Sequence, residues 1–115
     1  LIYAAKKYDV YAVGFEINPA LVRLAKREIA FRGLGSSTEV VHADFFTQDI
    51  SRFDVIYCYP SPSVADILGL KLQRECKRGC RVVIHDHLPS NLEPVCVVRL
   101  PSQGPHVHLI ALYIF

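Results

Sequence analysis

Hydrophobic and polar positions along the chain form segments of two kinds, some with helical spacing and some with the length and pattern of β-strands. Helical spacing is found over residues 1–8, from about Pro19 to Arg32, and from about Ser63 to Lys77. Short apolar or alternating runs, which predict strands, cover residues 10–16, 38–42, 53–59 and 81–84. Strands interspersed with helices in this way are typical of an α/β fold built on a parallel sheet.

The pattern changes near the C-terminus, where two strand-like runs follow one another. They cover residues 94–100 and 106–115 and are joined only by Pro101 to Pro105. Because this link is too short for a crossover helix, the two strands are expected to form an antiparallel hairpin. We therefore predict that the four earlier strands are mutually parallel and that the strand at 107–115 is antiparallel to them.

Local signals mark the ends of the first full helix. Asn18 can cap its first turn through the side-chain oxygen, and Pro19 suits the first helical position, which needs no N–H. Gly33 is expected to end the helix. Its predicted apolar face consists of five residues, Leu21, Val22, Leu24, Ala25 and Ile29. The continuous apolar run at 53–59 predicts a strand that is covered on both faces.

The composition is that of one folded domain in a reducing compartment. The length of 115 residues, 51% of them hydrophobic, is enough for a single domain, residues 1–115, with a real core. The 13 Lys and Arg residues are dispersed among 11 Asp and Glu residues, so no nucleic-acid partner is indicated. No apolar run is long enough to cross a bilayer. The four cysteines form no CxxC pair, and we expect a cytoplasmic protein.

Two carboxylates follow predicted strands at the edge of the sheet where open α/β proteins bind their ligands. Glu16 closes the strand at 10–16, and Asp44 comes just after the strand at 38–42. An acid in this position can take the ribose hydroxyls of a nucleotide, although an acid in a strand-to-helix turn can equally be solvated. Asp44 has a compatible second role as the N-cap of a short helix or turn that runs through Gln48.

The predicted parallel strands and C-terminal hairpin resemble the class I S-adenosylmethionine-dependent methyltransferases, in which acids corresponding to Glu16 and to Asp44, in the run Val40 to Phe46, follow the second and third strands. Within that class, three runs resemble small bacterial and archaeal relatives of the mitochondrial lysine methyltransferases that act on the adenine nucleotide translocator and on subunit c of ATP synthase. These runs are Ala5 to Tyr8, Val13 to Val22, and Arg81 to Asp86. The resemblance implies an α/β, Rossmann-like methyltransferase fold, with a mostly parallel sheet that ends in a C-terminal antiparallel hairpin.

The same resemblance implies that part of the family's domain is absent from this sequence. The first strand and the glycine-rich cofactor loop would lie immediately before Leu1. The chain also contains no methionine, whereas a translated chain normally begins with one. We therefore expect a partial, N-terminally truncated domain that leaves two strand edges unpaired and is inactive as it stands.

The resemblance also implies a cofactor, S-adenosylmethionine, and a set of residues that bind it. These residues are Glu16 and Ile17 at the ribose, Asp44 and Phe45 on either side of the adenine, and Tyr59.

The reaction that the resemblance implies is methyl transfer to a nitrogen nucleophile. The run Tyr59-Pro60-Ser61-Pro62 partly resembles the Asn/Asp-Pro-Pro-Tyr loop of adenine and glutamine methyltransferases but lacks its leading Asn or Asp. This departure favours an aliphatic amine, above all a lysine side chain of a protein, with a small-molecule amine as the alternative. We expect Tyr59, His85 and Asp86 to be the catalytic and substrate-facing residues.

Other interpretations of the same residues remain open. His85-Asp86-His87 and His106-Val107-His108 each place two histidines on one face of a strand, a pattern that binds metal where two such pairs converge. We assign no metal site, because that convergence requires a particular strand register. A nicotinamide-dependent oxidoreductase would also have an acid at Glu16, and a non-catalytic remnant of the fold would act as an interaction module.

Overall fold

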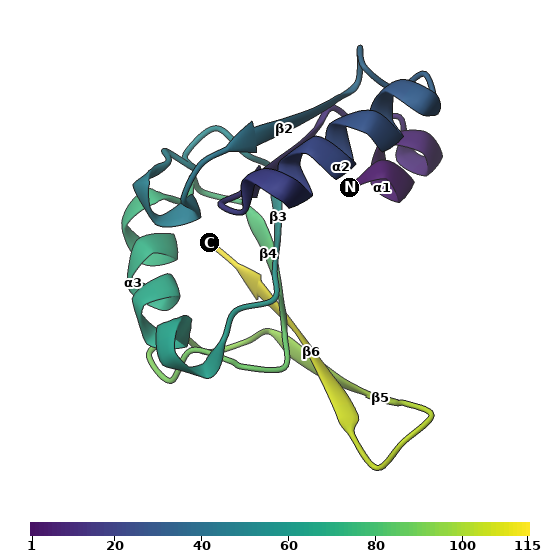
Figure 1. Cartoon of the computed structure of the whole chain (residues 1–115). Helices are drawn as coiled ribbons and strands as arrows, with labels where there is room; N and C mark the ends of the chain where they lie inside the picture. The colour runs from purple at the N-terminus through teal and green to yellow at the C-terminus, as the bar shows by residue number, and fades with distance from the viewer. The chain divides into compact units, whose positions relative to one another are not determined.

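The computed structural model describes all 115 residues, which divide into two compact units, Leu1–Gln48 and Asp49–Phe115 (Figure 1). The first unit contains a parallel pair of strands and two α-helices. Its elements are α1 (Ile2–Tyr8), β1 (Ala12–Glu16), α2 (Pro19–Phe31), β2 (Thr38–His42) and the 3-10 helix η1 (Phe45–Thr47). In the β1–β2 pair Ala12 lies opposite Thr38 and Glu16 opposite His42, so both strands end at the same edge.

Helix α2 begins and ends as its capping residues predict. The Asn18 side-chain oxygen accepts a hydrogen bond from the Ala20 N–H at 2.9 Å, and Pro19 is the first helical residue. Gly33 follows the helix with a φ of 68°, in the left-handed region that favours glycine. The helix boundaries are therefore set by interactions within a few residues of each end.

The predicted apolar face of α2 is only partly confirmed. Val22 and Ile29 are buried against Val40 of β2 and form the core of this unit. Leu21 and Leu24, however, are 49% and 56% exposed, so their assignment to the buried face was wrong. Since each helical residue turns about 100°, Leu24 lies on nearly the opposite side of the helix from Val22. The face of α2 that packs on the strands is therefore narrower than the apolar face predicted from the sequence.

The second unit contains a four-stranded sheet and one α-helix. Its elements are β3 (Val55–Cys58), the 3-10 helix η2 (Pro62–Val64), α3 (Ala65–Glu75), β4 (Arg81–His85), β5 (Cys96–Pro101) and β6 (Val107–Ile114). The strand order is β3-β4-β6-β5, with β3 parallel to β4 and β6 antiparallel to both β4 and β5. The predicted antiparallel C-terminal hairpin is confirmed, as are the two parallel pairs.

One face of this sheet packs on α3 to form the core of the second unit. The most deeply buried side chains are Ile50, Leu68, Leu72, Cys80, Val82 and Ile84. Ile56 of β3 is also buried, but Val55 and Tyr57 on either side of it are 55% and 62% exposed. The expectation that β3 is covered on both faces was therefore wrong: successive side chains of a strand point to opposite faces, and those of Val55 and Tyr57 are open.

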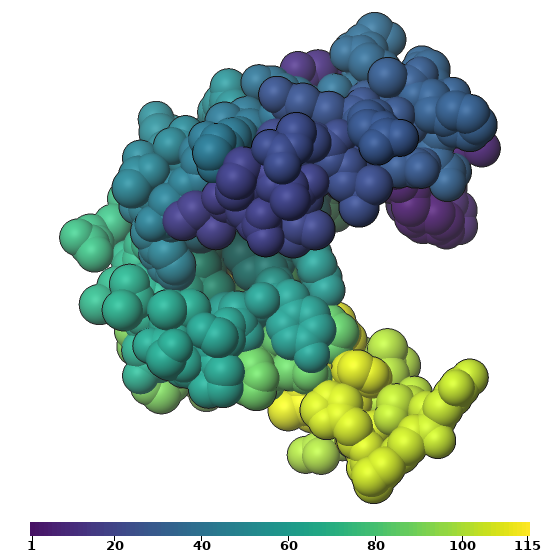
Figure 2. All heavy atoms as spheres, viewed as in Figure 1, coloured from purple at the N-terminus to yellow at the C-terminus, as the bar shows by residue number.

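The segments that follow β4 hold the end of this strand in place. Ser90 donates two hydrogen bonds to Asp66 in the first turn of α3, from its N–H at 2.7 Å and from its hydroxyl at 2.9 Å. The Asn91 side-chain amide donates to the Asp66 carbonyl at 3.0 Å. The hairpin of β5 and β6 then extends away from the rest of its unit, as the yellow-green atoms in Figure 2 show. None of the helices is both long and apolar enough to span a membrane.

Candidate functional site

Glu16 lies where β1 turns into α2, and the turn orients its carboxylate. The residue is partly buried, and its Oε1 accepts a hydrogen bond from the Asn18 N–H at 3.3 Å. The carbonyl of the next residue, Ile17, is bonded to His42 Nε2 at 3.0 Å, while the Ile17 side chain is 65% exposed. The turn is thereby tied to the end of β2. Glu16 can accept further hydrogen bonds through Oε2.

Asp44 and Phe45 follow β2 at the same edge of the first unit. The Ala43 N–H donates to the Glu16 carbonyl at 3.1 Å, which extends the β1–β2 pairing to the residue before Asp44. Asp44 caps η1, because its Oδ1 accepts from the Phe46 N–H at 3.0 Å. The Phe45 ring lies 6.3 Å from that of Phe15, centroid to centroid. Glu16 and Asp44 therefore share one edge of the β1–β2 pair, as the positions of the strand ends predict.

Asp86, the residue immediately after β4, holds a buried carboxylate. Its side chain is only 5% exposed, and its backbone has a φ of 64°, in the left-handed region. The Tyr59 hydroxyl donates to Asp86 Oδ2 at 2.7 Å, and the Leu109 N–H donates to Oδ1 at 3.0 Å. The hydrogen bond from Tyr59 holds the pKa of Asp86 well below its usual range despite the opposing effect of burial, with further lowering by Leu109 and His106. The same bond raises the pKa of Tyr59.

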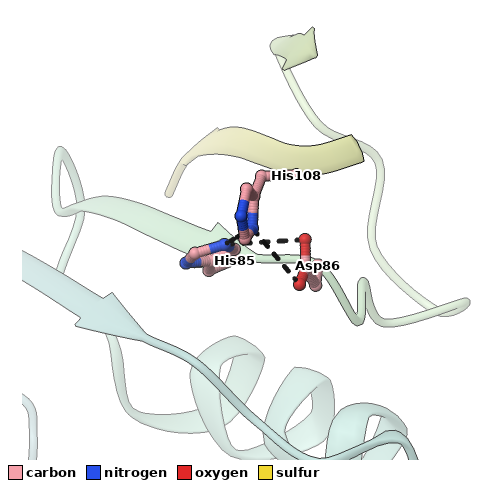
Figure 3. Close-up of side chains that lie close together, drawn as sticks. All are labelled: His85, Asp86 and His108. Atoms are coloured by element: carbon pink, nitrogen blue, oxygen red, sulfur yellow. Dashed lines mark hydrogen bonds and ion pairs between the residues drawn. The ribbon is translucent and has the colours of Figure 1, made fainter. Parts of the chain in front are cut away.

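Three histidines complete the arrangement around this carboxylate. His85 Nε2 lies 2.8 Å from His108 Nδ1 and 3.6 Å from Asp86 Oδ1, and Figure 3 shows these three side chains converging. His106 Nε2 lies 3.0 Å from Asp86 Oδ2. The Tyr59 ring covers His85 with a centroid distance of 4.0 Å and an interplanar angle of 31°. We refer to Tyr59, His85, Asp86, His106 and His108 as the histidine–aspartate cluster.

The chemistry open to the histidine–aspartate cluster is that of an anionic carboxylate among imidazoles and an aromatic wall. A carboxylate with donors on both oxygens stays ionised and can bind a cation. Neutral imidazoles can accept a proton or a metal ion, depending on tautomer. The aromatic ring of Tyr59 adds a surface on which the stem and charge of an amine can lie.

The structure brings the sequence-predicted residues together in two groups, one in each unit. Glu16, Ile17, Asp44 and Phe45 lie at one edge of the first unit, and Tyr59, His85 and Asp86 lie together in the second. His106 and His108 were considered only as a metal-binding alternative. Their part in the cluster depends on the β4–β6 register, in which His85 lies opposite Ile110, two residues from His108. His87, which the sequence pattern pairs with His85, makes only a backbone hydrogen bond there.

Comparison with known proteins places the chain in a family. Residues 1–96 match the ANTKMT methyltransferase domain. The chain belongs to this methyltransferase family. The predicted enzyme class and Rossmann-like fold are therefore confirmed, and the nicotinamide-dependent alternative is not supported.

The relatives of this methyltransferase chain include two lysine methyltransferases. It is 34% identical to a protein-lysine N-methyltransferase of Saccharolobus islandicus (strain REY15A), over 99% of this chain and 71% of the relative. It is 29% identical to an ATP synthase C-subunit lysine N-methyltransferase of Xenopus laevis, over 72% of this chain and 37% of the relative.

Solved methyltransferase structures share the fold. An RNA methyltransferase from Salinibacter ruber, in complex with S-adenosyl-L-homocysteine, superposes with a TM-score of 0.87 at 29% identity, covering 98% of this chain and 71% of the other. A tRNA (uracil-54, C5)-methyltransferase of Pyrococcus abyssi shares the fold alone, with a TM-score of 0.76 at 22% identity over 96% of this chain and 30% of the other.

Proposed function

We propose that this protein transfers a methyl group from S-adenosylmethionine to the side-chain amine of a lysine in a protein substrate. The names of the two sequence relatives support a lysine acceptor, and the family supports methyl transfer. The observation in this chain that carries the proposal is the Asp86 carboxylate, 5% exposed and bonded to the Tyr59 hydroxyl at 2.7 Å. An ionised acid beside an aromatic ring suits a long, cationic amine. The proposal takes residues 1–115 as one methyltransferase domain.

The strand ends of the first unit fit an adenosine-containing cofactor. Glu16 has an oxygen, Oε2, to accept from ribose hydroxyls, and the Asn18 N–H fixes the position of its other oxygen. We assign the ribose to Glu16 with Ile17, and the adenine to Asp44 with Phe45, whose partly buried ring offers an apolar surface. Crystal structures of three similar folds hold S-adenosylmethionine or S-adenosyl-L-homocysteine, which supports this cofactor.

When bound, S-adenosylmethionine supplies an activated methyl group, so the protein's part is to align the acceptor and remove water from it. Asp86 binds the incoming lysine as its ammonium ion. Tyr59 holds the carboxylate by its hydrogen bond and covers the stem of the amine with its ring. His85, whose Nε2 lies 3.6 Å from Asp86 Oδ1, takes the proton that the ammonium must lose before its nitrogen can act as a nucleophile. A lysine that arrives already deprotonated needs no such base.

To test this proposal, the protein as encoded by its gene is incubated with labelled S-adenosylmethionine and a cell lysate. The labelled products are then identified by mass spectrometry. We expect label on lysine side chains of protein. Tyr59→Phe and Asp86→Asn should each lower turnover by about 10-fold or more, because each removes a hydrogen bond or charge at the carboxylate that binds the amine, and hydrogen bonds to charged groups contribute about 1.5 to 3 kcal/mol. Cofactor affinity should be retained. Matched controls are Tyr3→Phe and Asp54→Asn, which remove the same groups outside the cluster and should leave turnover unchanged. Label on RNA or on small molecules, with none on lysine, would refute the lysine acceptor.

A further inference from the structure

We propose that His85, Asp86 and His108 form a binding site for one divalent transition-metal ion of the zinc or cobalt class. The three residues come from the end of β4 and from β6, which lie side by side in the antiparallel register. Each offers one ligand atom, and these atoms lie within 4.8 Å of one another. The proposal of this metal site rests on the positions of the ligand atoms and is independent of the proposed methyl transfer.

The ligand atoms are close to the spacing of a metal site. Zinc binds histidine nitrogens and carboxylate oxygens at about 2.0 to 2.2 Å, so two ligand atoms of a tetrahedral site lie about 3.3 to 3.5 Å apart. The two imidazoles lie close together, with 2.8 Å between His85 Nε2 and His108 Nδ1. Asp86 approaches them through different oxygens, at 3.6 Å from Oδ1 to His85 Nε2 and 3.7 Å from Oδ2 to His108 Nδ1. A metal that replaces the hydrogen bond between the imidazoles requires them to separate by about half an ångström and the carboxylate to turn one oxygen toward both.

Neighbouring groups already orient two of the ligands. His85 Nδ1 lies 3.0 Å from the Tyr57 hydroxyl, so a proton on Nδ1 leaves the lone pair of Nε2 for the metal. Asp86 accepts hydrogen bonds from Tyr59 and from the Leu109 N–H, which fix the plane of its carboxylate. Outer partners of this kind are a regular feature of metal sites in proteins. Their presence distinguishes this cluster from exposed side chains that happen to be close.

The charge and softness of the ligands indicate which ions fit. Two imidazoles and one carboxylate suit Zn²⁺, Co²⁺ and Ni²⁺, whereas Ca²⁺ and Mg²⁺ prefer oxygen ligands alone. His106 Nε2 lies 3.0 Å from Asp86 Oδ2 but is not one of the three residues whose ligand atoms all lie within 4.8 Å of one another, so the fourth position is left to a water molecule. A three-residue site with one open position results.

A metal in this site would compete with the methylation that we propose, and this consequence alone rests on the proposed function. His85 Nε2 and the Asp86 carboxylate are the atoms assigned to the lysine amine, and a bound cation would occupy them. Metal binding should therefore inhibit methyl transfer by excluding the ammonium group.

The first experiment measures metal binding directly, in the gene-encoded protein without an affinity tag. Isothermal titration calorimetry with Zn²⁺ should show one tight site, and Co²⁺ should give the intense visible absorption of four-coordinate nitrogen and oxygen ligation. His108→Ala should weaken Zn²⁺ binding by about 100-fold or more, because it removes a ligand. Tyr57→Phe should weaken it by about 10-fold, because it removes only the group that orients His85.

Two controls make the result specific. His87→Ala removes a nearby histidine that does not belong to the cluster and should leave Zn²⁺ affinity unchanged. Binding to cysteine would give sulfur-to-cobalt absorption in the near ultraviolet and would persist in His108→Ala. Circular dichroism identifies a variant that fails to fold, in which case His108→Gln takes its place. Absence of the tight site from the parent protein, or equal affinity in a folded His108 variant, would overturn the metal site.

The second experiment tests the competition. Addition of Zn²⁺ should inhibit lysine methylation in the parent protein. In a His108 variant, the Zn²⁺ concentration that gives half-maximal inhibition should rise by about the factor by which its Zn²⁺ affinity falls. Tight Zn²⁺ binding with unchanged methylation would uphold the metal site and refute the assignment of the amine to His85 and Asp86. The two proposals can thus fail separately.

Discussion

Gly69 lies in the middle of α3, and a methyl group added there has two opposing effects on the stability of the protein. Helix propensity alone favours Ala over Gly by about 1 kcal/mol. The space around Gly69 is occupied, however: an added Cβ would overlap the Asn91 Oδ1 atom and lie 2.8 Å from Pro89 Cβ. We therefore expect Gly69→Ala to destabilise the protein.

The magnitude follows from what must move. Overpacking of this kind costs about 1 to 3 kcal/mol. Displacement of Asn91 also breaks its hydrogen bond to the Asp66 carbonyl, which contributes about 0.5 to 1.5 kcal/mol. After the helix-propensity gain of about 1 kcal/mol is subtracted, the expected net loss in free energy of unfolding is about 0.5 to 3.5 kcal/mol. The loop that would shift begins three residues after Asp86, so the same substitution should also loosen the candidate site.

Urea denaturation followed by circular dichroism gives the free energy of unfolding for this test. The control is the same substitution in an Asn91→Ala background, where only the contact with Pro89 remains and the loss caused by Gly69→Ala should be smaller. An alanine variant as stable as the parent protein, or more stable, would show that helix propensity outweighs packing here and would refute the reasoning.

Three further outcomes are expected. Glu16→Ala should weaken S-adenosylmethionine binding by about 10- to 150-fold through the loss of hydrogen bonds to a charged group, and unchanged affinity by calorimetry would remove Glu16 from the site. Tyr113→Phe should raise the free energy of unfolding by about 1 kcal/mol in a urea titration, because the buried Tyr113 hydroxyl has no hydrogen-bond partner; a loss of stability would contradict this. Hydrogen bonds from Ser90 lower the pKa of Asp66 below its ordinary 3.8, so Asp66→Asn should destabilise the protein at neutral pH, by an amount that shrinks as the pH falls through that lowered pKa. A deficit that stays the same from neutral to strongly acidic pH would argue against the ionised carboxylate.

Features that depend on neighbouring residues could be predicted from the sequence. The cap at Asn18 and Pro19, the end of α2 at Gly33 and the β5–β6 hairpin are all fixed by short-range geometry, and each is found where it was expected. The exposed fractions of Leu21 and Leu24 could not be predicted in this way. The hydrophobic residues of a helix show which of its sides can be buried. The strand that packs against the helix determines how much of that side is buried.

The candidate site shows the same division. Glu16 and Asp44 were placed at one sheet edge from their positions at strand ends, and the structure has them there, while Asp86 came from the family resemblance. The roles of all three stay predictions. The approach of His85 to His108 was not predicted, because it joins residues 23 positions apart through the β4–β6 register, and a shift of one residue would turn the histidine to the other face. The sequence pattern therefore indicated which histidines share a strand face but not which pair would meet.

The backbone at Asp86 restricts which residues evolution can place there. With a φ of 64°, the position is open to glycine and, among residues with side chains, mainly to asparagine and aspartate. Codons for asparagine and glycine each differ from those for aspartate by one base, so both tolerated replacements are immediate mutational neighbours, whereas glutamate would keep the charge but strain the turn. A relative that has given up this chemistry should therefore carry Asn or Gly here. Such a change would preserve the hairpin register while abolishing the carboxylate, so the function can be lost in one mutation while the fold survives.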